Sequence, residues 1–320
     1  MKSRQIRNSL LLVLTALIWG VAFVAQSTGG DAAGPFSFNG IRSLIGSAVL
    51  VPVIFLLDKM GLGSKRPQTK EEKKTLITGG ICCGTALFLA SSAQQLGITM
   101  GTASGKAGFL TACYILLVPI LGLFLKKKCG WNIWVGMLIT IGGLYLLCMN
   151  GSLTFQNSDL MVLLCAFLFA VHILTVDYFS PKVDGVRMSC IQFLVCGLLS
   201  MVPMYFVDMK HSAVGFAEWL PGLMDPSAWI AILYAGIFSC GVGYTLQIVG
   251  QNGLNPTIAS MIMSLESVFS VLAGWIILGE KLNGRQLLGC ALIFVAILLA
   301  QMPCGTKSPE KTGKKDAGSL

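Results

Sequence analysis

The sequence predicts an all-α membrane protein in which ten transmembrane helices form two inverted five-helix repeats. Three observations carry this prediction: an apolar composition, ten long apolar segments, and a duplication of the chain. Hydrophobic residues make up 54% of the 320 residues and charged residues 12%, against roughly 25% charged residues in soluble domains. The charged residues gather at the ends of long apolar runs, which excludes a soluble globule, a disordered chain, a coiled coil and a disulfide-stapled secreted domain.

Ten segments are long and apolar enough to cross a bilayer, which takes ~20 mostly apolar residues. They are expected at 8–28, 36–57, 75–98, 103–125, 131–149, 159–179, 188–207, 228–250, 256–279 and 284–302. Glycine and proline separate the segments, as at Asn255-Pro256. Pro119 and Pro203 fall inside segments, where neighbouring helices can satisfy the backbone groups that proline leaves free.

Lysine and arginine residues set the expected orientation, because cytoplasmic loops carry an excess of both. Most of the 23 such residues lie at 2–7, 59–74, 126–128, 182–187 and 307–315. Both termini are therefore predicted to be cytoplasmic in a multi-pass protein of the plasma (inner) membrane. The net charge of +9 is then a topology signal, and nucleic acid is not an expected partner.

A shift of about 150 residues aligns the first half of the chain with the second. Gln94 then falls on Gln247, Gly136 on Gly289, and Ala16–Gly20 on Ala166–Ala170. The expected units are a first repeat at 1–150 and a second at 151–302, followed by a disordered cytoplasmic tail at 303–320. Because each repeat holds five spans, an odd number, the second must enter the membrane from the opposite face. Carriers use such inverted repeats to alternate between two open states around one central site.

A known family shares several of these residues. They are Trp19-Gly20, Arg42, Leu265-Glu266-Ser267-Val268-Phe269, Gly279-Glu280-Lys281-Leu282 and Gly289. In this order, and with the duplication, residues 8–302 resemble EamA-type ten-helix carriers of the drug/metabolite transporter superfamily. The resemblance implies a secondary transporter that moves a small metabolite, amino acid or drug-like compound across the plasma membrane by alternating access, with export as the expected direction.

The chain departs from the family pattern at several positions. Lys126-Lys127-Lys128 stands where a Gly-Glu pair is frequent, and Ser267 stands where proline is common. In the second repeat, Phe169-Ala170 replaces a second Trp-Gly pair and Gln192 takes the place that Arg42 holds in the first. These differences concern substrate and coupling rather than fold.

Four ionisable residues lie inside apolar spans, where a charge is costly and indicates function by default. Glu266, near the middle of the ninth span, is a candidate to bind a substrate amine or a coupled proton, or else a structural carboxyl. His172 can relay protons near neutral pH, although a lone histidine also serves as a packing residue. Lys106 and Arg42 are candidates for charge pairing or ligand contact. The alternatives are snorkelling for the lysine and an anchor to external carbonyls for the arginine.

Five uncharged residues complete the predicted substrate site. Trp19 offers an aromatic wall and one N–H donor, or alternatively packs in the core beside a glycine. Gln94 and Gln247, which the repeat relates, are expected to line the outer and inner vestibules. Tyr244 accompanies the second glutamine, and Tyr114 lies near the middle of the fourth span.

Other functions remain as alternatives to a metabolite carrier. A multidrug or organic-cation exporter would use the same aromatic cavity. A lipid-handling protein, or an intramembrane enzyme such as a serine hydrolase using His172, belongs to another class. The chain has no Gly-x-Ser-x-Gly elbow, zinc motif or acidic metal-binding cluster, so no enzyme, catalytic residue, cofactor or metal site is predicted. The expected partners are a small-molecule substrate, the bilayer and coupled protons, and a homodimer is left open.

Overall fold

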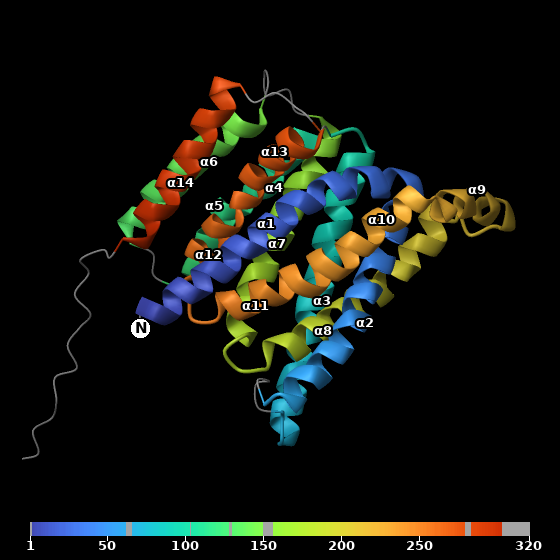
Figure 1. Ribbon diagram of the computed structural model, residues 1–320, viewed down its shortest axis with the longest axis horizontal. Coiled ribbons are helices and arrows are strands. Elements are labelled where there is room, and N and C mark those ends of the chain that lie inside the picture. The colour runs from blue at the N-terminus through green and yellow to red at the C-terminus, as the bar shows by residue number, and fades with distance from the viewer. Residues whose placement is uncertain are drawn as a thin grey trace, which may run out of the picture.

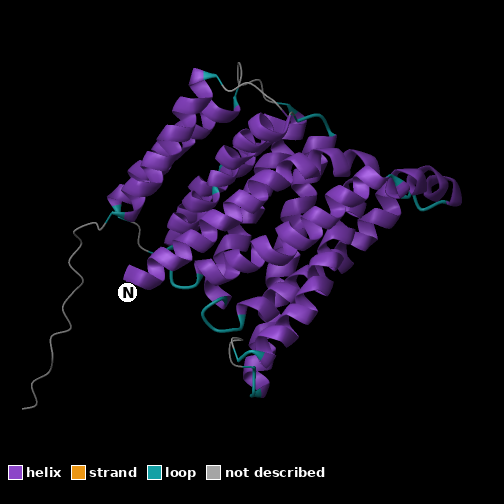
Figure 2. Cartoon of the chain, in the orientation of Figure 1, coloured by secondary structure: helices purple, strands orange, loops and turns teal. Residues whose placement is uncertain are grey.

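The computed structural model describes residues 2–61, 66–102, 104–127, 130–149, 156–278 and 283–302. This part of the chain is a bundle of tilted helices and contains no strand (Figure 2). Ten helical stretches in it are long and apolar enough to cross a membrane, which confirms the predicted fold class. The predicted tail and the Gly279–Leu282 part of the family motif lie outside the described residues.

The ten spans follow one another along the chain, some of them divided into shorter helices (Figure 1). The first five are α1 (Lys2–Ala33), α2 (Pro35–Lys59), α3 (Lys70–Thr99), α4 (Ser104–Ala112) with α5 (Tyr114–Phe124), and α6 (Trp131–Cys148). The second five are α7 (Asn157–Phe179), α8 (Gly185–Pro203) with η1 (Met204–Asp208), α10 (Pro226–Tyr234) with η2 (Ala235–Tyr244) and α11 (Thr245–Gln251), α12 (Pro256–Met263) with α13 (Leu265–Leu278), and α14 (Gly284–Gln301).

Local sequence signals set where several helices begin. Thr69 and Glu72 form a capping box at the start of α3, and Asn283 and Gln286 form another at the start of α14. Each box satisfies backbone N–H groups that have no partner within the helix. Proline occupies the first turn of α2, α10 and α12, where its missing N–H costs nothing.

An additional helix, α9 (Ala213–Met224), lies between the seventh and eighth spans, where the sequence predicts only a loop. It lies at one edge of the bundle, beside the start of α10 (Figure 1). The indole N–H of Trp219 donates to the carbonyl of Ala33 at 3.1 Å and to the hydroxyl of Ser37 at 2.8 Å. Pro221 lies inside this helix and does not end it.

The fourth and ninth spans are both interrupted, at positions that differ by two residues in the register that aligns Gln94 with Gln247. Cys113 separates α4 from α5, and Ser264 separates α12 from α13. The N–H of Cys113 bonds to the carbonyl of Leu110 at 3.2 Å, three residues back, which marks a local tightening of the helix. The sequence predicts two continuous spans here, so these breaks are a structural finding.

The packing of α6 against α14 shows the inverted relation directly. A Cβ atom built on Gly136 would lie 2.9 Å from the carbonyl oxygen of Ala296, and one built on Gly143 would lie 2.8 Å from that of Gly289. The helices are antiparallel, because the later residue of α6 meets the earlier residue of α14. The shift that places Gly136 on Gly289 also places Gly143 on Ala296, so exchanging the repeats turns one contact into the other, as an inverted repeat requires.

Candidate functional site

A cavity of about 60 Å³ lies between the two repeats, at the level of the two helix breaks. Thr111 and Tyr114 line it from the two sides of the first break, and Met263 and Glu266 line it from the two sides of the second. The volume is sufficient for several water molecules or a few ligand atoms. The π-helix η2 also contributes, through Ser239 and Tyr244, and π-helical segments occur frequently at functional sites.

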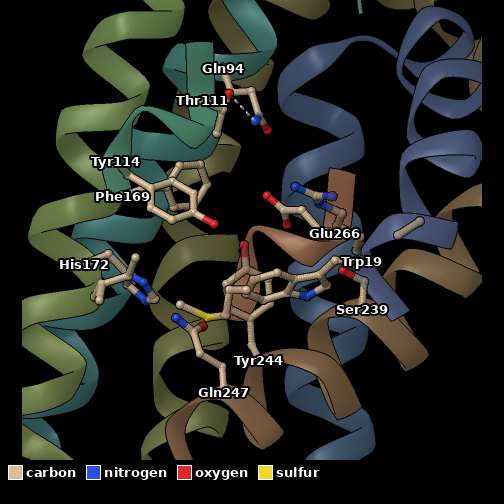
Figure 3. Close-up of a pocket in the computed structure, with 14 residues that line it drawn as sticks. Trp19, Gln94, Thr111, Tyr114, Phe169, His172, Ser239, Tyr244, Gln247 and Glu266 are labelled. Carbon is tan, nitrogen blue, oxygen red and sulfur yellow. Dashed lines mark hydrogen bonds between the residues drawn. The ribbon is translucent and has the colours of Figure 1, made fainter. Parts of the chain in front are cut away.

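The cavity brings together all but one of the residues that the sequence singles out. Eight of them line it: Trp19, Arg42, Gln94, Tyr114, His172, Tyr244, Gln247 and Glu266. The lining also includes residues that sequence reasoning missed: Ala22, Thr111, Phe169, Ile173, Ser239 and Met263. Phe169 carries a usable signal, because the repeat places it on Trp19. Figure 3 shows the labelled side chains gathered from several helices around one space.

Tyr244 is the centre of an aromatic group at the cavity wall. Its ring centroid lies 4.5 Å from that of Trp19, with the two rings tilted by 51°. His172 and Phe193 approach the same ring edge-on, with centroids at 6.1 Å and 5.3 Å. The indole N–H of Trp19 is buried and has no hydrogen-bond partner. This wall therefore offers apolar aromatic faces to a ligand, while the Trp19 N–H lies against Gly243.

The cavity contains two side chains that carry opposite charges when ionised. Glu266 is 8% exposed, and no described residue forms a hydrogen bond or ion pair with its carboxyl group. The Nε atom of Arg42 is likewise buried without a partner, and its guanidinium lies over the Phe38 ring at 5.0 Å. Burying a charge without a partner is costly. Both groups are therefore available to a ligand.

Amide and imidazole groups supply the remaining polar surface. The amide of Gln94 donates to the hydroxyl of Thr111 at 3.0 Å (Figure 3). Nε2 of the fully buried His172 lies 2.9 Å from Oε1 of Gln192, while Nδ1 has no partner. Because an amide oxygen only accepts, Nε2 is the donor and Nδ1 of the neutral ring is an acceptor. The Oε1 atom of Gln247 is also buried and unpartnered.

Lys106 lies outside the cavity lining. Its ammonium group forms an ion pair with the carboxylate of Asp159, which joins α4 to α7. Asp159 also accepts from the backbone N–H of Gln156 at 2.7 Å and from the hydroxyl of Thr102 at 3.1 Å. Of the roles considered for Lys106, pairing with an acid is the one that the structure displays.

Comparisons with known proteins agree with this architecture. The sequence pattern of the EamA-like transporter family matches the chain twice, at residues 7–149 and 156–302. An uncharacterized transporter of Archaeoglobus fulgidus is 26% identical over 93% of this chain and 87% of its own length. The uncharacterized transporter YoaV of Bacillus subtilis is 24% identical over 92% and 97% of the two chains.

A plant relative and a solved structure extend the comparison. A chloroplastic WAT1-related protein of Arabidopsis thaliana is 25% identical over 92% of this chain and 69% of its own length. A solved structure titled "Crystal structure of protein" superimposes with a TM-score of 0.73 at 20% identity, covering 92% of this chain and 96% of the other. The ten spans and the doubled family match make this protein a membrane transporter rather than an enzyme. The chain belongs to the EamA-like transporter family.

Proposed function

We propose that this protein is a secondary transporter that exports a small zwitterionic metabolite, such as an amino acid, across the plasma membrane by alternating access. The observation that carries the proposal is that the cavity between the repeats contains both Arg42 and Glu266, neither of them paired with another described side chain. A ligand with a carboxylate and an ammonium group would neutralise both. Trp19 and Tyr244 would pack against its side chain.

The difference between the repeats supports a ligand with two distinct ends. The repeat places Gln192 where the first repeat has Arg42, and Gln192 bonds to His172. The guanidinium thus comes only from the first repeat. Glu266 comes from the second. Such a site favours one orientation of a dipolar ligand over the other, because reversal would bring like charges together.

Transport by this site needs no covalent chemistry. A carrier needs only two conformations, each open to one side of the membrane, that bind the ligand with different affinities. Glu266 is also the candidate for a coupled proton, because protonation would remove its charge when no ammonium group is bound. His172 is the second proton candidate, through its unpartnered Nδ1 atom.

An organic-cation exporter is the second candidate function. The observation in its favour is that Glu266 shares the cavity with Trp19 and Tyr244, since aromatic faces bind cations. A cation lacking a carboxylate would leave Arg42 unpaired. We therefore expect zwitterions to be preferred.

A counterflow assay on the purified protein in liposomes tests the proposal. Amino acids, nucleosides and organic cations are loaded inside in turn, and entry of the same labelled compound is followed. We expect amino-acid counterflow that Glu266→Gln reduces strongly and that Glu218→Gln leaves unchanged, because Glu218 is exposed on α9 and pairs with Lys210. Counterflow of cations alone would favour the second candidate, and no counterflow with any class would overturn both.

A further inference from the structure

The two ends of the central cavity are packed differently, although the repeats make them equivalent. α12 packs against α5. Exchanging the repeats converts this pair into α4 and α13, and within the described residues these two helices form no comparable contact. The α5 end lies next to Lys126 and Lys127, in one of the basic loops that indicate the cytoplasm. The α5–α12 contact thus closes the cavity toward the predicted cytoplasmic face, and the described residues show no equivalent contact between α4 and α13 on the other side.

Apolar side chains form the closed end. Ile115 and Val118 of α5 and Ile262 of α12 are all fully buried and belong to one cluster with Leu12 of α1. Such a contact is held by packing rather than by directed polar bonds. It can therefore separate without leaving broken hydrogen bonds behind.

Two glutamines lie along α11, on the way from the cavity to the same face. Gln247 lines the cavity, and Gln251 follows it by one helical turn at the end of α11. Each is only 1% exposed. The Oε1 atom of Gln247 and both amide atoms of Gln251 have no hydrogen-bond partner. Leaving a buried amide group unpaired is unfavourable, and native proteins rarely do so without a reason.

The fold itself does not require a polar residue at the second of these positions. The shift that places Gln94 on Gln247 also places Ile98 on Gln251. The equivalent position of the first repeat therefore accepts an isoleucine. No described protein group bonds the amide of Gln251 in this conformation, so the amide is available for a ligand in another one.

We propose that Gln247 and Gln251 form a polar track along the cytoplasmic half of the transport path, and that the α5–α12 contact is the gate that closes it here. When α12 moves away from α5, the two amides become hydrated and bind the carboxylate, ammonium or amide groups of a passing ligand. Gln251 is then a second binding subsite, one helical turn from the central cavity. This inference rests on the proposed transport function.

Thiol labelling tests the gate independently of flux. Inside-out vesicles containing the Gln251→Cys or the Ile248→Cys variant are treated with a membrane-impermeant methanethiosulfonate. Modification of the introduced cysteine is measured by peptide mass spectrometry, with the wild-type protein as background. Ile248 is the control because it is fully buried on the same helix, packed against Met188 and Val176. We expect Gln251→Cys to react and Ile248→Cys to stay unmodified. Equal reactivity of the two, or no reaction of Gln251→Cys, would overturn the proposal.

A second variant separates a transport role from a structural one. Gln251→Ile carries the residue of the equivalent position in the first repeat, and we expect its melting temperature to match or exceed that of the wild type. We also expect counterflow of the amino-acid panel to slow several-fold. If the wild-type protein shows counterflow, a Gln251→Ile variant with a lower melting temperature, or with unchanged counterflow, would contradict the proposed polar track. A wild-type protein without counterflow would instead count against the proposed function, whatever the labelling result.

Discussion

The amide of Gln94 donates a 3.0 Å hydrogen bond to the hydroxyl of Thr111 at the wall of the central cavity. This bond joins α3 to the last turn of α4, next to the break at Cys113. It fixes the direction of the Gln94 amide and leaves its oxygen toward the cavity (Figure 3). Gln247, the repeat equivalent, has an unpartnered amide oxygen. The two glutamines therefore present related groups to a ligand, one held in place and one not.

Replacing Thr111 by valine is expected to weaken substrate binding more than it weakens the fold. The side chain keeps its shape, but the Gln94 amide loses its acceptor and is no longer oriented. We expect the KM of counterflow to rise several-fold, with a small fall in melting temperature. Thr175→Val is the matched control, because the hydroxyl of Thr175 bonds only to a carbonyl of its own helix, at 2.8 Å. A KM change of equal size in both variants would count against this role.

Breaking the Lys106–Asp159 ion pair is expected to destabilise the protein. The Asp159 side chain is fully buried and that of Lys106 is 15% exposed, and removing one partner of a buried pair costs about 3–5 kcal/mol. Lys106→Met should therefore lower the melting temperature clearly. Lys127→Met is the control, because the side chain of Lys127 is 45% exposed in its pair with Asp177 and exposed pairs contribute about 0–1 kcal/mol. Equal melting temperatures for the two variants would show that the buried pair adds nothing.

The contact between α6 and α14 is expected to tolerate no additional methyl group. A Cβ atom at Gly143 would lie 2.8 Å from the Gly289 carbonyl oxygen and from a side-chain atom of Ile293. Overpacking of this kind costs about 1–3 kcal/mol, so Gly143→Ala should lower the melting temperature. Gly142→Ala provides the comparison on the same helix, because nothing lies within 4 Å of a Cβ atom there. The prediction fails if the two alanine variants have the same melting temperature.

The predicted topology places residues 152 and 283 on one face of the membrane. Ser152→Cys and Asn283→Cys should both react with an impermeant maleimide in whole cells, whereas a cysteine at Arg4 should react only after permeabilisation. The wild-type protein measures the background from native cysteines. Labelling of residues 152 and 283 from opposite faces would rule out two antiparallel five-helix repeats.

The ten spans could be predicted from the sequence, because each must bury about 20 apolar residues in lipid and hydropathy records this directly. The breaks at Cys113 and Ser264 could not. Each affects only a single residue within an apolar run, and packing between helices decides where such a run tightens. Helix α9 was also missed, because its 12 residues are too few for a transmembrane span and include Pro221.

The residues of the candidate site likewise include some that could be predicted from the sequence and some that only the structure reveals. Glu266 and Arg42 could be found because an ionisable group in an apolar span is costly and therefore conspicuous. Thr111 and Ser239 could not be found. Hydroxyl groups within helices commonly bond to the backbone of their own helix, so their presence in the sequence does not indicate that they face a cavity. Lys106 was singled out, but Asp159, its partner, is distant in the sequence, and only the fold brings the two together.

A binding cycle between Glu266 and the ligand amine tests the central claim most directly. The affinity of the purified protein for an amino acid found by counterflow is compared with that for its analogue lacking the amine, in the wild type and in Glu266→Gln. A charge-assisted bond contributes about 1.5–3 kcal/mol, so the wild type should bind the parent roughly tenfold to a hundredfold more tightly than the analogue. In Glu266→Gln we predict that this preference disappears, with binding of the analogue retained. An undiminished preference in the variant would contradict the assignment of Glu266 to the substrate amine.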